Sequence, residues 1–121
     1  FQFENISSRG DEKINEIIKS NLLSRSKGDK KYNINLYSKK DKQIVSTDSK
    51  GDPKNYKLQI KVDYEVLLSE KHIYENTAVK QATYNNITDK YELSQYENNI
   101  TKILSENIAE ELLLSIKTLG K

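Results

Sequence analysis

The most constraining feature of the chain is an eleven-residue alternation, YKLQIKVDYEV, at positions 56–66. A repeat of two predicts a β-strand with one face buried and the other in water. The strand is long against the usual length of about 5–6 residues. The residues at the even-numbered positions, called the apolar parity of this strand, are expected to point to the buried face; they are Tyr56, Leu58, Ile60, Val62, Tyr64 and Val66. Such a strand needs neighbouring strands at its edges and a layer of other structure over its apolar face.

Three further segments predict strands. They are an opening strand with Phe1, Phe3 and Ile6, a second at 32–36 and a fourth at 72–83. Residues 43–47 are a weaker candidate for an extension of the second. Asp48 to Lys54, with Gly51 and Pro53, predicts a turn before the long strand. The connection at 69–71 is too short for a crossover helix, so the third and fourth strands are expected to pair antiparallel.

Two segments predict amphipathic helices. The first covers about residues 11–25, with acidic Asp11 and Glu12 at its start and the sequence Arg25 to Gly28 at its end. Its apolar stripe comprises Ile14, Ile17, Ile18 and Leu22. The second covers about residues 90–118, and Gly120 follows as a stop signal. Its apolar stripe comprises Leu93, Tyr96, Ile100, Ile103, Leu104, Ile108, Leu112, Ile116 and Leu119.

The order of these segments, β-α-β-β-β-α, predicts an α+β fold in a single domain of residues 1–121. Each helix has one apolar stripe, and the sheet has one apolar face. We therefore expect a two-layer sandwich, with both helices on one face of a four-stranded, mostly antiparallel or mixed sheet.

The composition argues against an enzyme. The chain has no Cys and a single histidine, His72, and its four glycines are not clustered into a phosphate-binding loop. No G-x-S-x-G nucleophile motif occurs. Asp48 and Asp52 lack the spacing of an EF-hand loop. The sequence thus predicts no catalytic residue, no metal site and no cofactor.

Positive charge is concentrated in the middle of the chain. Residues 27–61 hold ten lysines and four aspartates, although the net charge of the whole chain is only +2. Together with eight tyrosines, this leaves open a small α+β module that binds single-stranded nucleic acid. However, Tyr56 and Tyr64 lie on the apolar parity, and Tyr37 alone falls on the polar parity of its strand. Most tyrosines are therefore expected to pack inward.

The chain carries a set of motifs in a fixed order: Gly51 with the strand YKLQIKVDYEVL (56–67), Ile73-Tyr74, the step ATYN (82–85) and the helical run IAEELLL (108–114). This set resembles the LptE family, outer-membrane lipoproteins of the lipopolysaccharide translocon. The resemblance covers nearly the whole chain and rests on the order of the segments as much as on identity.

The resemblance implies a non-catalytic protein that plugs and helps to assemble the LptD β-barrel and binds lipopolysaccharide. It implies attachment to the periplasmic face of the outer membrane through a lipidated cysteine upstream of Phe1. A start at Phe1 in a chain without Met fits the mature part of a longer precursor. No nucleic-acid partner is expected on this interpretation.

Family members contact lipopolysaccharide through basic residues near the turn before the long strand and near the start of the last helix. Lys50, Lys54 and Lys57 occupy the first place, and Lys90 occupies the second. Ser49 stands two residues before the turn glycine, where the family carries Arg. The four lysines are the candidate binding residues, because ammonium groups suit lipid A phosphates.

Overall fold

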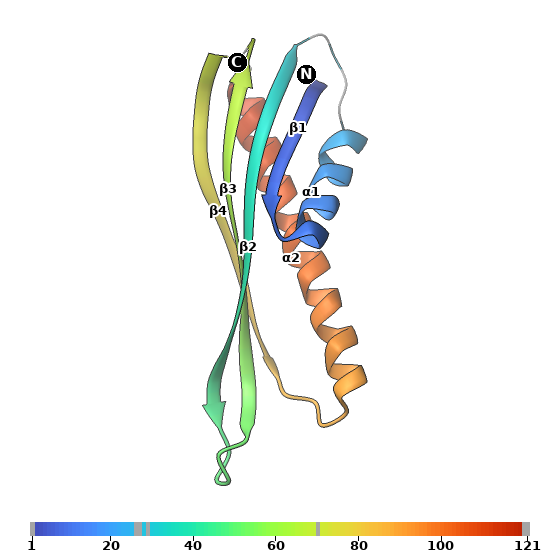
Figure 1. Cartoon of the computed structure of the whole chain (residues 1–121), viewed down its shortest axis with the longest axis vertical. Helices are drawn as coiled ribbons and strands as arrows, with labels where there is room; N and C mark the ends of the chain where they lie inside the picture. Colours follow the sequence, from blue (N-terminus) through green and yellow to red (C-terminus); the bar gives the residue numbers. More distant parts are fainter. Residues whose placement is uncertain (1, 26–27, 29, 70, 120–121) are drawn as a thin grey trace.

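A computed structural model describes residues 2–25, 28, 30–69 and 71–119 of the chain. Its elements follow the predicted order (Figure 1): β1 (Gln2–Gly10), α1 (Glu12–Ser24), β2 (Lys31–Thr47), β3 (Pro53–Leu68), β4 (Lys71–Asn85) and α2 (Lys90–Leu119). The predicted α+β fold is confirmed. Phe1 of the opening strand, Ser26 and Lys27 at the first helix end, Glu70 in the short turn and the Gly120 stop signal lie outside the described residues.

The four strands form one mixed sheet in the order β1-β2-β3-β4. β1 runs parallel to β2 because α1 connects them, whereas β2–β3 and β3–β4 are antiparallel. β2 is a continuous strand of 17 residues, much longer than the predicted 32–36 with its weaker extension. Its middle, for example Lys39 and Asp41, has little apolar pattern but pairs in register with Lys61 and Gln59 of β3. Pairing with a strongly patterned neighbour therefore determines this part of β2.

Both helices cover the same face of the sheet, and α2 runs along most of its length (Figure 1). The apolar parity of β3 faces the helices and is almost completely buried from Leu58 to Val66, while Tyr56 is half-buried. The helices bury Ile14, Ile18 and Leu22 of α1 and Leu104, Ile108, Leu112, Leu113 and Ile116 of α2. The predicted two-layer arrangement is confirmed.

The apolar stripe of α2 differs from the prediction at two positions. Tyr96 and Ile103 are 46% and 56% exposed. The buried side instead includes the small residues Thr101, Ser105 and Ala109, spaced four apart. Counting only large apolar residues missed them, because small side chains on the inner face of a helix carry little hydrophobic signal. In the described part of the chain, neither helix is long and apolar enough to cross a membrane.

The junction between β1 and α1 is held against β2. Asp11 caps α1 by accepting a hydrogen bond from the backbone N–H of Ile14 at 3.0 Å, and its own N–H donates to the carbonyl of Ser38 at 3.2 Å. The Ser38 hydroxyl is buried and donates to the Asn15 side chain at 2.7 Å. Gly10 ends β1 with φ at +97°.

We expect Gly10→Ala to destabilise the protein strongly, because a Cβ there would overlap the carbonyl oxygen of Ser38 in addition to straining the backbone. Gly51→Ala is the matched control. Gly51 also has positive φ, +87°, but no atom lies within 4 Å of its would-be Cβ. Its cost should be limited to about 1–2 kcal/mol of backbone strain. Urea unfolding of both variants checks this, and equal losses of unfolding free energy would contradict it.

Candidate ligand-binding end and open sheet face

The tip of the β2–β3 hairpin is an ordered turn that carries Lys50. The carboxylate of Asp48 accepts hydrogen bonds from the backbone N–H groups of Lys50 at 2.9 Å and Asp52 at 3.0 Å. The N–H of Gly51 donates to the Asp48 carbonyl at 3.0 Å. The predicted turn is therefore confirmed, and the turn between β2 and β3 lies at the extremity of the molecule (Figure 1). Lys50, in this turn, is exposed.

Two further candidate lysines lie at the same end of the molecule. The loop between β4 and α2 is tied to the start of β3, because Asn86 donates through its N–H to the Lys54 carbonyl and through its side chain to the Pro53 carbonyl, each at 2.9 Å. Lys90 begins α2 immediately after this loop. Lys54 and Lys90 are exposed.

The fourth candidate, Lys57, lies farther along β3, on the face away from the helices. The structure thus brings three of the four lysines to one end and leaves the fourth on the adjoining open face. None of the four forms an ion pair with another described residue. Their role in binding stays a prediction.

An aromatic and ionic cluster joins the hairpin to α2 near this end, and the sequence did not reveal it. The Tyr84 ring lies 5.7 Å from the Tyr56 ring and 5.8 Å from the Tyr96 ring. The Lys42 ammonium lies 4.2 Å from the centre of the Tyr56 ring and 2.8 Å from the Glu97 carboxylate. Glu97 also accepts a hydrogen bond from the Tyr84 hydroxyl. Lys42 therefore makes its contacts within the fold, whereas Lys90 forms no ion pair with another described residue.

The contacts of Glu97 shift two pKa values in the cluster. Burial alone opposes ionisation of Glu97, but hydrogen bonds from Lys42 and Tyr84 outweigh it, so the pKa of Glu97 is lowered. Burial, followed by the hydrogen bond to Glu97, raises the pKa of Tyr84. At neutral pH the cluster therefore holds a carboxylate between an ammonium group and a neutral phenol.

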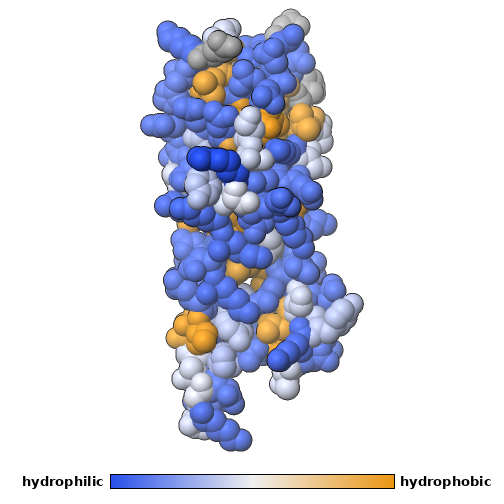
Figure 2. Space-filling view, in the orientation of Figure 1, coloured by the Kyte–Doolittle hydropathy of each residue, from blue (hydrophilic) through white to orange (hydrophobic). Residues whose placement is uncertain are grey.

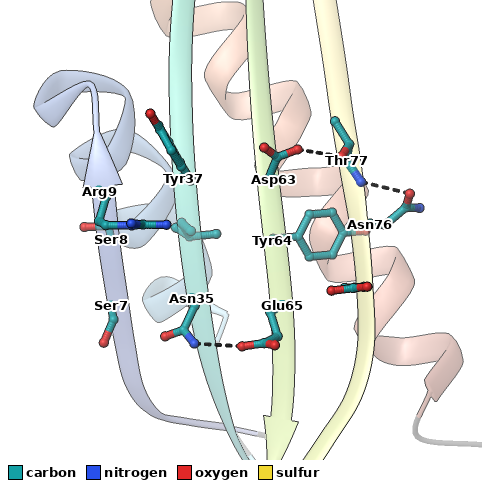
Figure 3. A pocket seen from close by; sticks show the side chains of 12 residues that line it. Ser7, Ser8, Arg9, Asn35, Tyr37, Asp63, Tyr64, Glu65, Asn76 and Thr77 are labelled. Carbon is teal, nitrogen blue, oxygen red and sulfur yellow. Dashed lines mark hydrogen bonds between the residues drawn. The ribbon is translucent and has the colours of Figure 1, made fainter.

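The sheet face away from the helices is open and polar. Figure 2 shows a largely hydrophilic surface with separate small hydrophobic spots. The open face has a concavity of about 800 Å³ that spans all four strands. Within it, Asn35 donates to Glu65 at 2.9 Å and Thr77 donates to Asp63 at 2.6 Å (Figure 3). Polar cross-strand pairs of this kind stabilise a sheet face that remains in contact with water.

One aromatic ring of the strands is displayed on this open face in the described part of the chain. Tyr37 is 36% exposed, and the guanidinium carbon of Arg9 and the ammonium of Lys39 each lie 4.9 Å from its ring centre. Tyr56, Tyr64 and Tyr84 lie on the helix-covered side. The face therefore lacks the row of exposed rings on which successive bases stack in single-strand binding proteins.

The chain shares its fold with bacterial lipoproteins of known structure. The rare lipoprotein B from Shewanella oneidensis superposes with a TM-score of 0.73 at 13% identity, over 97% of this chain and 96% of that protein. The minor lipoprotein from Acinetobacter baumannii gives 0.69 at 16%, over 97% and 92%. Lipoprotein B from Nitrosomonas europaea gives 0.71 at 12%, over 99% and 86%. No protein-family model and no curated protein matches the sequence.

We expect Glu97→Gln to lower the free energy of unfolding at pH 7 by about 1–3 kcal/mol, because it weakens a charge-assisted hydrogen bond to Lys42. The pKa of Glu97 is lowered by folding, so its contribution is present above its ordinary value of 4.5 and is lost as pH falls through the lower folded value. The difference between the variant and the wild type should therefore shrink at pH 3.

Urea unfolding at pH 7 and pH 3 measures this difference. Glu106→Gln is the control on the same helix, since Glu106 forms no ion pair with a described residue. A difference for Glu97→Gln that is equal at both pH values would contradict the assignment of charge to Glu97.

Proposed function

We propose that this chain is the folded domain of a lipid-anchored lipoprotein of the LptE type in the outer membrane, on the periplasmic side. In this role it plugs the lumen of an LptD-like β-barrel, assists assembly of that barrel and binds lipopolysaccharide, with no catalytic step. The observation that carries the proposal is the similarity of fold to bacterial lipoproteins over nearly the full length of both chains. It agrees with the sequence motifs that resemble the LptE family.

The open face supports the partner part of the proposal. A barrel that carries polar material has a polar lumen. The outward residues of β3, from Lys57 to Glu65, are all polar, and they lie on the side of the sheet that no helix covers. A polar sheet face can enter such a lumen. Before assembly, it also exposes no large apolar patch that would favour aggregation.

The basic end, which is the end of the molecule that carries Lys50, Lys54 and Lys90, supports the ligand part of the proposal. Lys50, Lys54 and Lys90 are exposed near the hairpin tip and form no ion pair with a described carboxylate, so their ammonium groups are available to phosphates. The half-exposed Ile44 and the more exposed Tyr91 lie toward the same end of β2 and α2. Cationic and apolar groups together match an anionic amphiphile such as lipid A.

The fourfold variant Lys50→Glu, Lys54→Glu, Lys57→Glu and Lys90→Glu is expected to bind lipopolysaccharide at least about tenfold more weakly. Reversal of each charge replaces attraction to phosphate with repulsion. Affinity for purified lipopolysaccharide can be measured by fluorescence titration, and circular dichroism should report an unchanged fold. The control carries the same charge change at the opposite end of the molecule: Lys30→Glu, Lys31→Glu, Lys71→Glu and Lys117→Glu.

An equal loss of lipopolysaccharide affinity in the two fourfold variants would mean that the loss comes from the change in net charge. That result would contradict a binding site at the hairpin tip. The barrel partner is tested separately by co-purification of the lipid-anchored protein from outer membranes. Recovery without a β-barrel partner would contradict the plug role while leaving the lipopolysaccharide result intact.

A further inference from the structure

Three side chains with metal-binding atoms meet on the open face, at the end of the sheet opposite the hairpin tip. The Nε2 atom of His72 lies 3.8 Å from Oε2 of Glu65 and 3.7 Å from Oε2 of Glu75. The three ligand atoms all lie within 4.8 Å of one another. This group belongs to neither the basic end nor the aromatic cluster. A single histidine in the sequence gave no sign of it.

A β-bulge in β4 is what brings His72 and Glu75 to the same side. Residues three apart in a regular strand point to opposite faces. Here Val66 pairs with Tyr74 but Leu67 pairs with His72, so Ile73 is one extra residue in β4. The bulge turns Ile73 toward the core, where it packs against buried residues, and returns His72 to the open face.

The same pairing places two negative charges directly opposite each other. Glu65 and Glu75 are register partners across β3 and β4. Like charges in this arrangement destabilise a sheet unless a cation lies between them. The Asn35 amide donates to Oε1 of Glu65 at 2.9 Å (Figure 3), which directs the other oxygen of that carboxylate toward His72. A hydrogen bond that orients a carboxylate in this way is typical of the residues behind metal ligands.

We propose that Glu65, His72 and Glu75 bind a divalent transition-metal ion, with zinc as the representative ion. One imidazole nitrogen and two carboxylate oxygens form a donor set that zinc accepts, whereas magnesium and calcium prefer oxygen alone. Tetrahedral zinc with bonds of about 2.0–2.2 Å separates its ligand atoms by about 3.3–3.6 Å. Small rotations of exposed side chains close the remaining difference. Glu65 and Glu75 also line the concavity of the open face.

The competing explanation is an ion pair of protonated His72 with the two carboxylates. Both explanations use the same three residues, but they differ in what happens when a metal is added. An ion pair predicts no response beyond weak contact of zinc with a surface imidazole. A metal site predicts that affinity depends on both glutamates and on Asn35, which touches the carboxylate rather than the ion.

The test is zinc titration of the protein without a histidine tag, followed by NMR of the imidazole protons and by calorimetry. Because the chain contains one histidine, its ring signals report directly on this site. We expect saturable 1:1 binding that shifts the His72 ring signals. His72→Ala should abolish this binding, and Glu65→Gln or Glu75→Gln should weaken it at least about tenfold. Asn35→Ala should weaken it by about tenfold or more.

Glu106→Gln serves as the matched control and should leave the zinc affinity unchanged. Circular dichroism of each variant establishes that it is folded, which is expected because none of the substituted side chains is buried. Two results would overturn the proposal. One is the absence of a change in the His72 ring signals at a large molar excess of zinc. The other is unchanged zinc affinity in the double variant Glu65→Gln, Glu75→Gln, which would mean binding to the imidazole alone.

Discussion

The structure depends on the two-sided character of β3. This strand is hydrogen-bonded to β2 on one edge and to β4 on the other, so its register positions the whole sheet around it. Its inner face is at most 3% exposed between Leu58 and Val66, which makes it the floor on which both helices pack. A one-residue slip of β3 would exchange that floor for a row of polar groups, so the burial of the inner face also determines which groups line the outer one.

The architecture was readable from sequence wherever a segment carries its own pattern. Strict alternation in β3 and helical spacing in α1 and α2 predicted the element order and the two layers. The middle of β2 was missed because its side chains follow no local pattern, and its strand conformation comes from pairing with β3. Tyr96 and Ile103 are more exposed than their place in the predicted stripe implied, because Thr101 and Ser105 occupy the most buried positions of that part of α2; Tyr96 still packs against Tyr84.

The candidate binding residues divide in the same manner. Lys50, Lys54 and Lys90 lie at one end of the molecule. β2 and β4 run in the same direction because each is antiparallel to β3, so the hairpin tip after β2 and the start of α2 after β4 lie at the same end. The element order already implies this arrangement. The contact between Lys42 and Glu97 joins residues far apart in the chain, and no spacing rule connects them. His72 and Glu75 share a face only through the bulge at Ile73, and a bulge leaves no mark in the pattern of β4.

Some charges are matched within the fold and others are not, and this difference separates structural residues from candidate binding residues. On the helix side, Glu97 is matched by Lys42 and Glu111 by Lys80, because a charge near low-dielectric surroundings is costly without a partner. On the open side, the facing carboxylates of Glu65 and Glu75 have, among the described residues, only the imidazole of His72 within ion-pair distance, and that group is charged only when it is protonated. A charge distribution that the fold itself does not neutralise is complementary to an external cation at one end and an external anion at the other. The open face and the hairpin end are therefore where binding partners of this chain should be sought.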